Sequence, residues 1–146
     1  MEQDVRGTFH RQPMMATLGA TLERVSPGEV EIKLPFDQAH TQHTGALHAG
    51  VVTAIVDSAC GFAAATLMPA GKAVVSVEFK LNLLSPAAGD SFRAIGRVVR
   101  AGRTLTVCIG EVWATRGDTT TLVAIMQATM MAVANDIVQP GQAATS

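Results

Sequence analysis

The most constraining feature of the sequence is a run of twenty residues, Ala49 to Met68, that contains a single charged side chain, Asp57. A helix that is apolar on all sides must be buried around most of its circumference. The run is long enough to span a membrane, but its charge lies near the centre, Gly50 and Gly61 interrupt it, and alanine dominates where a spanning helix would be rich in leucine. We therefore predict a buried helix in a globular domain and no membrane segment.

The segments around this run alternate between apolar and polar residues, as strands do. A hairpin is predicted over residues 19–35, because Val30, Ile32 and Leu34 alternate with charged residues after the turn at Pro27. Beyond the helix, alternation resumes over residues 75–83, with Ser76 on the expected polar face. Further strands are predicted over residues 91–101, 105–116 and 121–134, separated by turns that contain glycine.

This order of elements, two strands, one long helix and four strands, predicts an α+β fold. A single apolar helix needs a curved, largely antiparallel sheet of five to six strands wrapped around it. We interpret residues 1–146 as one domain, with an N-terminal extension over about 1–16 that includes a short helix beginning at Pro13. Residues 135–146 are expected to form a loose polar tail.

Charge and composition exclude several classes of function. Lys and Arg total 11 against 12 Asp and Glu, so nothing suggests electrostatic capture of nucleic acid or of an anionic membrane. A hydrophobic fraction of 48% predicts subunit contacts. The first fifteen residues lack the apolar core of an export signal, which indicates a cytoplasmic protein. In that compartment Cys60 and Cys108 are expected to be buried free thiols.

Asp57 lies on the small-residue side of the predicted helix. Residues within about 60° of it on a helix of 3.6 residues per turn are Gly50, Thr53, Ala54, Cys60, Gly61 and Ala64. The bulky residues on the opposite side are Val51, Val52, Ile55 and Phe62. We expect the bulky side to pack on the sheet, and the small side to let another backbone or a slender ligand approach Asp57.

The helix opens with His48-Ala49-Gly50, where the first amides have no partner within the helix. A bare Gly50 N–H could stabilise an oxyanion, and a carboxylate could activate water, which together would hydrolyse a carbonyl compound. Asp57 lies about 10 Å farther along the helix axis, too far for one chain to do both. Two copies of the helix running antiparallel across a two-fold axis would bring Asp57 level with the partner's helix start. We therefore predict active sites shared between two subunits.

The order of elements and the pattern Gln42-x5-His48-Ala49-Gly50-x6-Asp57 resemble the acyl-CoA thioesterases of the hot dog fold, in particular their PaaI-like branch. The resemblance covers about residues 17–134. It implies that the Gly50 amide polarises the thioester carbonyl and that Asp57 acts as base or nucleophile. It also implies that His48 supports the turn, that Gln42 lies near the carbonyl, and that Ser76 helps to hold the water. The family has His-Gly-Gly where this chain has Ala49 in the middle position.

The resemblance implies hydrolysis of small or medium acyl-CoA thioesters, aliphatic or aryl, to free acid and CoA. No metal or cofactor is expected, since coenzyme A is part of the substrate. The protein would be a homodimer with shared active sites, assembled further into a dimer of dimers.

Other interpretations of the same residues stay open at this point. The fold also supports hydratase or dehydratase chemistry on acyl thioesters, or an acyl-CoA-binding module without catalysis. Asp57 could be a structural carboxylate. Three further groups of residues have both a functional and a structural interpretation. The histidines could be zinc ligands or loop supports, the arginines CoA phosphate ligands or solvated strand ends, and the methionines the lining of an acyl pocket or part of the core. These are His40, His43 and His48; Arg97, Arg100, Arg103 and Arg116; and Met126, Met130 and Met131.

Overall fold

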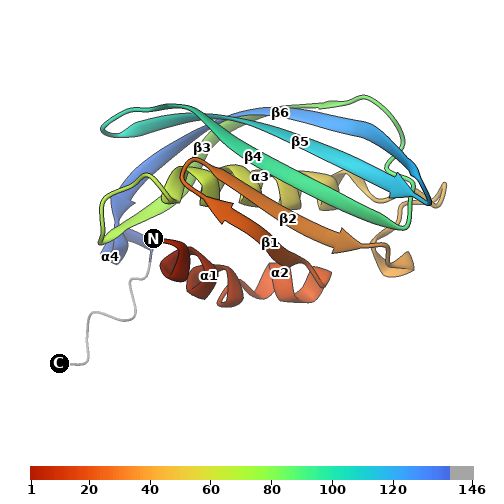
Figure 1. Ribbon diagram of the computed structural model, residues 1–146, viewed down its shortest axis with the longest axis horizontal. Helices are drawn as coiled ribbons and strands as arrows, with labels where there is room; N and C mark the ends of the chain where they lie inside the picture. Colours follow the sequence, from red (N-terminus) through yellow and green to blue (C-terminus); the bar gives the residue numbers. More distant parts are fainter. Residues whose placement is uncertain (139–146) are drawn as a thin grey trace.

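The computed structural model describes residues 1–138 (Figure 1). Its helices are α1 (Glu2–His10), α2 (Pro13–Leu18), the 3-10 turn η1 (Gln38–His40), α3 (Ala49–Ala65) and α4 (Asn135–Val138). Its strands are β1 (Thr21–Ser26), β2 (Glu29–Pro35), β3 (Lys72–Leu83), β4 (Ser91–Ala101), β5 (Leu105–Arg116) and β6 (Thr119–Ala134).

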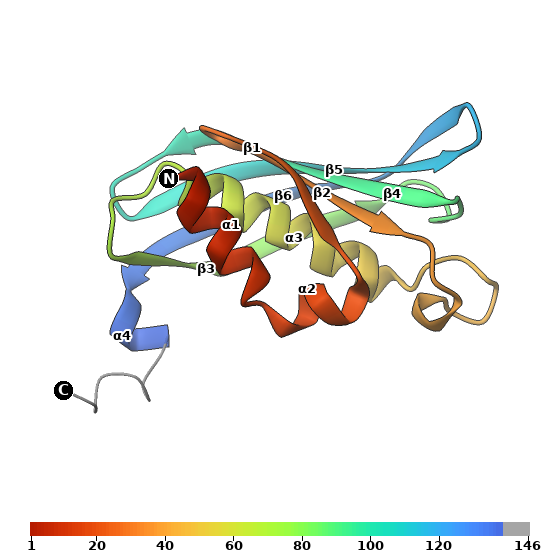
Figure 2. The ribbon, with the colours of Figure 1, turned by 60° about the horizontal axis from the view of Figure 1, so that its bottom comes forward.

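The strands form one six-stranded antiparallel sheet in the order β1-β2-β4-β5-β6-β3. The sheet curves over α3, which contacts β2, β3, β4, β5 and β6, and α1 with α2 lies alongside, near β1 (Figures 1 and 2). The predicted architecture, an α+β fold with an antiparallel sheet around one long helix, is confirmed. The curvature leaves β1 and β3 as the two edges of the sheet.

The close seat of α3 on the sheet depends on two glycines that are cross-strand partners, Gly96 in β4 and Gly110 in β5. A Cβ atom on Gly96 would collide with the backbone of α3 at Ala59, and one on Gly110 would lie 2.9 Å from the Sγ atom of Cys60. Glycine inside a strand typically marks such a close approach. The helix can therefore lie directly against β4 and β5, with Val56, Ala59 and Cys60 fully buried.

The predicted hairpin and helix begin and end close to where the sequence placed them, and α2 begins at Pro13 as expected. Two features differ. The N-terminal extension holds a further helix, α1, and residues 135–138 form the short helix α4 where a loose tail was predicted. The rest of that tail, residues 139–146, lies outside the described residues.

The predicted small side of α3 is only partly free. Gly50, Thr53, Ala54 and Asp57 are exposed or half-buried, as expected. The C-terminal members of the set, Cys60, Gly61 and Ala64, are buried. The reason is twofold: the sheet reaches around the helix at Cys60, and α1 covers its C-terminal half, where the Phe9 ring packs 5.8 Å from the Phe62 ring.

A β-bulge in β3 corrects another expectation. Ser76 pairs with Met130 and Phe79 pairs with Ala128, and both partners are buried under the sheet. Cross-strand partners share a face, so Ser76 and Phe79 lie on the same, helix-facing side, although simple alternation predicts opposite sides. The register shift between Ser76 and Glu78 inserts Val77 as the extra residue. The bulge therefore turns Ser76 towards α3.

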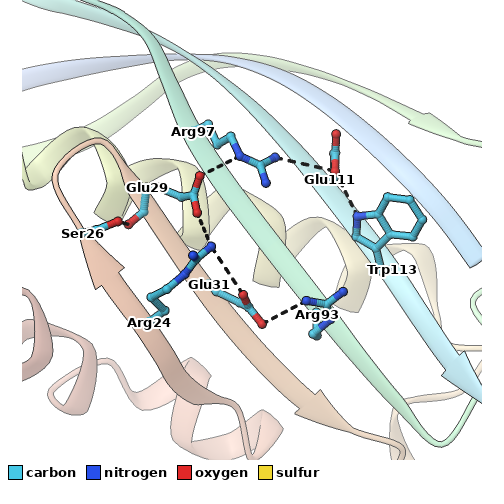
Figure 3. Close-up of polar contacts among 8 residues, drawn as sticks. All are labelled: Arg24, Ser26, Glu29, Glu31, Arg93, Arg97, Glu111 and Trp113. Atoms are coloured by element: carbon cyan, nitrogen blue, oxygen red, sulfur yellow. Dashed lines mark hydrogen bonds and ion pairs between the residues drawn. The ribbon is translucent and has the colours of Figure 1, made fainter. Parts of the chain in front are cut away.

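The opposite face of the sheet carries an ion network that crosses β1, β2, β4 and β5 (Figure 3). We call it the outer-face ion network, and its members are Arg24, Glu29, Glu31, Arg93, Arg97 and Glu111. Arg97 bridges Glu29 at 2.8 Å and Glu111 at 3.7 Å, and the indole of Trp113 donates to Glu111 at 3.0 Å. Each carboxylate in this network has at least one guanidinium partner.

No helix within residues 1–138 is long and apolar enough to cross a membrane. The apolar run that raised the question forms α3, and its sheet-facing residues Val52, Ile55 and Val56 are at most 1% exposed. The run therefore belongs to the hydrophobic core.

Candidate functional site

Asp57 lies near the middle of α3, where the bulge in β3 presents a hydroxyl to it. The Ser76 hydroxyl donates a 2.7 Å hydrogen bond to Oδ1 of Asp57 and lies 3.4 Å from the Met130 sulfur. Among residues 1–138, no Lys, Arg or His side chain lies within ion-pair distance of the Asp57 carboxylate. The structure therefore places Ser76, which the resemblance assigns to holding the water, in direct contact with Asp57.

The two thiols behind Asp57 are unsuited to nucleophilic chemistry. Cys60 and Cys108 are free and buried, as predicted, and the Cys108 thiol contacts the Cys60 carbonyl at 3.5 Å. Burial raises the pKa of Cys108 to about 11. Burial, with the nearby Cys108 and Asp57, also raises the pKa of the Cys60 thiol well above its ordinary value. Both side chains therefore stay protonated near neutral pH.

The amino end of α3 is capped by a histidine. His48 is the N-cap residue, and its Nδ1 atom accepts a 2.8 Å hydrogen bond from the Gly50 N–H. The backbone around it is anchored, since the His48 N–H donates to the His40 carbonyl and the Leu47 N–H to the Ala87 carbonyl, both at 2.9 Å. His48 therefore supports the turn directly, through the first free amides of the helix.

This cap changes one expectation, because the Gly50 N–H is not bare. A Cβ atom on Gly50 would lie 2.9 Å from Nδ1 of His48, which shows how closely the ring covers this position. The adjacent Ala49 N–H has no hydrogen-bond acceptor within residues 1–138, and Ala49 is only half-buried. The open amide at the start of α3 therefore belongs to the residue before the predicted one.

Gln42 holds a tight turn beside the helix start. Its N–H donates to the Ala46 carbonyl at 2.9 Å, its carbonyl accepts from the Gly45 N–H at 3.1 Å, and its side-chain oxygen accepts from the Thr44 N–H. Gly45 adopts a φ of 93°, which favours glycine. The side-chain NH2 group of Gln42 is left as the donor that can face the neighbouring cavity.

The site residues divide between two cavities. The first, of about 790 Å³, lies at the amino end of α3, and its lining includes Gln42, His48, Ala49, Leu83 and Pro86. We call it the loop cavity. The second, of about 900 Å³, holds Asp57 and Ser76 and extends past Gly61 and Phe62 to α1 and the segment after α3. We call it the acid cavity. Asp57 and Ser76 are thus together, and Gln42 and His48 are together, but one chain does not unite the two pairs.

Other candidate residues from the sequence make contacts that account for them structurally. No group of three or more His, Cys, Asp or Glu side chains within residues 1–138 could hold a metal ion. Arg97 is engaged in the outer-face ion network. Met126 and Met130 are at most 2% exposed and belong to the core. The interpretation of Met126 and Met130 as packing residues therefore holds, with Met130 also in contact with Ser76.

Sequence reasoning missed the contribution of α1 to the acid cavity. Asp4, Val5 and Thr8 of α1, and Arg11 directly after it, all line it. A signal was present, since Val5 and Phe9 are spaced four residues apart, as on one face of a helix, and both are buried. The short length of the segment hid that signal.

Comparison with known proteins gives a consistent picture. Residues 44–121, more than half of the chain, match the family described as the Thioesterase superfamily. A thioesterase family protein from Silicibacter pomeroyi has a crystal structure with a TM-score of 0.90 and 48% identity, covering 92% of this chain and 98% of that one. The PaaI protein from the phenylacetic acid degradation operon of E. coli has the same fold, with a TM-score of 0.81, 18% identity, and coverage of 90% and 91%.

A human relative, acyl-coenzyme A thioesterase 13, is 30% identical over 86 residues, which are 58% of this chain and 61% of that protein. Matches to curated relatives span between 56% and 69% of the relatives' length. The predicted resemblance to hot dog thioesterases is confirmed by the matched family and by the fold.

Proposed function

Since this chain belongs to the thioesterase superfamily, we propose that it hydrolyses small or medium acyl-CoA thioesters to a free acid and CoA. The observation that carries the proposal is the state of Asp57, a half-buried carboxylate at a cavity with one hydroxyl donor and no cation among the described residues. A carboxylate paired with a guanidinium is a weaker base, whereas Asp57 keeps the capacity to accept a proton. The human acyl-coenzyme A thioesterase 13 supports acyl-CoA as the substrate class.

The proposed reaction begins with Asp57 accepting a proton from a water molecule. The hydroxide oxygen bonds to the thioester carbonyl carbon, and the carbonyl oxygen becomes an oxyanion. That intermediate collapses by breaking the carbon–sulfur bond, and CoA leaves as a thiolate that takes up a proton. The Ser76 hydroxyl holds one oxygen of Asp57, so the other oxygen can face the water. Direct attack by Asp57 on the carbonyl carbon is the variant of this step that the resemblance leaves open.

The amino end of α3 is proposed to stabilise the oxyanion. Gly50, the residue expected from the sequence, can serve only if the carbonyl oxygen replaces Nδ1 of His48 as the acceptor of its N–H. The Ala49 N–H requires no such exchange, and Ala49 lines the loop cavity together with Gln42. We therefore assign Ala49 as the oxyanion donor, Gln42 as a second donor, and His48 with Gly50 as the structure that holds the turn.

The division of the site between two cavities supports a shared active site. Antiparallel packing of two α3 helices would place the acid cavity of one subunit against the loop cavity of the other. The surface available for such packing includes the half-buried Thr53 and Ala54 and the exposed apolar side chains of β3, Phe79 at 46% and Leu83 at 55%. β3 is also an unpaired sheet edge, which a second copy could extend. A homodimer follows as the proposed functional unit, with further assembly into a dimer of dimers proposed from the family resemblance.

The decisive experiment is Asp57→Asn assayed on a panel of acyl-CoAs by release of free thiol. We expect turnover to fall by about 10³-fold, because the isosteric amide cannot accept the proton, while the melting temperature changes little. Ser58→Ala, a change next to Asp57 at the same cavity, is the matched control and should keep wild-type turnover. Full activity of the asparagine variant would refute the proposal. A changing enoyl absorbance without thiol release would instead indicate hydratase chemistry, and binding without turnover in the wild type would indicate a binding module.

The amide assignment and the shared site can be tested together. Ala49→Pro removes only one N–H: Ala49 is the first helical residue, where proline is tolerated, and His48 has the extended φ of −59° and ψ of 137° that a residue before proline needs. We expect about a 10²- to 10³-fold loss of turnover, with Ala49→Gly remaining active.

Co-expressed Asp57→Asn and Ala49→Pro subunits should regain roughly a quarter of wild-type activity, because half of the dimers are hybrids with one intact site. Absence of any recovery would place acid and amide in one subunit.

A further inference from the structure

The acid cavity continues well past Asp57, and its far wall is α1. From the Asp57–Ser76 pair the cavity extends along Gly61 and Phe62 of α3, then between α1 and Lys72 at the start of β3. The two small residues Gly61 and Ala65 leave room on this side of α3 for a slender chain. Figure 2 shows α1 lying alongside α3. An acyl group whose carbonyl is at Asp57 would therefore direct its far end towards α1.

α1 is fixed in this position by specific contacts. Val5 and Phe9 are 5% and 4% exposed, and the Phe9 ring packs on Phe62. Arg6 donates to the Leu22 carbonyl at 3.3 Å and pairs with Glu2 on its own helix. The wall is thus a packed part of the domain, and its side chains face the cavity at defined positions.

The rim of this wall carries positive charge without local compensation. Arg11 and Lys72 both line the acid cavity, and neither has a carboxylate within ion-pair distance among residues 1–138. The guanidinium of Arg11 is held by one hydrogen bond, from Nη2 to the Thr8 hydroxyl at 3.1 Å. The other charged groups of the lining are Asp57, at the reacting end, and the pair formed by Asp4 and the terminal amine of Met1, which lie 3.5 Å apart. On the sheet, Arg24, Arg93 and Arg97 are paired with glutamates. Arg100 and Arg116 have no carboxylate within ion-pair distance among residues 1–138, but they do not line the acid cavity, whereas Arg11 and Lys72 do.

We propose that Arg11, with Lys72, selects acyl groups that carry a carboxylate at the end remote from the thioester. A guanidinium with one anchored nitrogen keeps other N–H groups free to donate to carboxylate oxygens. An acyl chain with an apolar middle and an anionic end matches an apolar floor followed by a cationic rim. This inference rests on the proposed function, because it assumes that the carbonyl lies at Asp57.

The test compares two acyl-CoAs of equal length, adipoyl-CoA and hexanoyl-CoA, which differ only in the terminal carboxylate. We expect the wild type to have the higher kcat/KM for adipoyl-CoA. Arg11→Gln should lower that value about two- to fivefold through KM, as for one exposed ion pair, and leave hexanoyl-CoA unchanged. Arg11→Lys should retain part of the preference. Lys33→Gln, which removes an exposed cation of β2 that is unpaired among residues 1–138 and lies outside the cavity, is the control and should not alter the ratio.

Binding to the Asp57→Asn variant gives a readout that does not need turnover. Adipoyl-CoA should bind more tightly than hexanoyl-CoA, and the added Arg11→Gln change should remove the difference. Equal affinities, or a preference for hexanoyl-CoA, would overturn the inference whether or not the wild type hydrolyses either compound. Hydrolysis of both compounds with a ratio that Arg11→Gln does not change would overturn it while leaving the proposed function intact. Binding with the expected preference but no hydrolysis of any acyl-CoA would refute the proposed function alone.

Discussion

The two faces of the sheet treat carboxylates in opposite ways. On the outer face, Glu29 and Glu31 each meet two arginines, and Glu111 meets Arg97 and the Trp113 indole (Figure 3). On the helix-facing side, Asp57 meets one serine hydroxyl. The outer carboxylates are held as charges and can contribute only to stability, whereas Asp57 keeps an oxygen available for chemistry. Glu23 and Glu78 are also held by one threonine hydroxyl each, but both are exposed. Among the half-buried carboxylates of residues 1–138, Asp57 is the one without a guanidinium partner, so burial and partner type together set it apart.

The largest effect is expected from breaking the contact of Asp57 with its one hydroxyl donor. Ser76→Ala should lower turnover by about 10- to 100-fold, because a hydrogen bond to a charged group is worth roughly 1.5–3 kcal/mol and the freed carboxylate can rotate away from the water. Ser76→Thr keeps a hydroxyl and should restore part of the rate. Steady-state kinetics on one acyl-CoA measures both. Wild-type turnover in the alanine variant would show that Asp57 needs no orienting partner.

An intermediate effect is expected from removing one charge of the outer-face ion network. Glu29→Gln should lower the free energy of unfolding by about 1 kcal/mol, since Arg24 and Arg97 both lose their shared partner, and should leave kcat unchanged. Chemical denaturation and the thiol-release assay measure the two quantities. Glu23→Gln, on the neighbouring strand β1 and without an ion pair in the described part of the chain, is the control and should change neither. A loss of turnover with Glu29→Gln would connect the two faces functionally.

The smallest effect is expected from salt. Raising the ionic strength to about 1 M shortens the screening length to about 3 Å, so the outer ion pairs should weaken by less than about 1 kcal/mol in total. The Asp57–Ser76 contact involves one charge and a hydroxyl, and it should be insensitive. The melting temperature of the wild type should therefore fall slightly with salt, and that of Glu29→Gln should fall less. An equal response in both proteins would mean that Glu29 contributes no net ion-pair energy.

The sequence was sufficient for the fold because periodicity reports burial along each element. The apolar run predicted α3, and alternation predicted the strands with errors of a few residues at their ends. Alternation failed at Val77, because one extra residue in a bulge reverses the side of the sheet on which the preceding residues of the strand lie. The amino-acid composition gives no signal for that insertion. Ser76 was therefore placed beside Asp57 by the family resemblance and not by its strand pattern.

The candidate site could be predicted in outline for a similar reason. Helix geometry gives the separation of Asp57 from the start of α3, so the proposal of a site shared by two chains follows from spacing alone. Spacing does not show which amide is open, because that depends on the orientation of the His48 ring. The ring accepts the hydrogen bond of the Gly50 N–H. The role of α1 was hidden as well, since nothing in its sequence indicates which cavity it would border.

The glycine pair under α3 has a consequence for the chemistry above it. Gly96 and Gly110 allow the helix to lie close to the sheet: a methyl group at Gly96 would collide with the backbone of α3, and one at Gly110 would crowd the side chains of Val56 and Cys60. In a dimer joined through α3, each subunit would carry a displacement of its helix to the common centre, so the acid from one side and the amide from the other would both move. In the proposed dimer, two strand positions away from the substrate would thus set the distance between the acid and the amide, and the thioester must fit between them.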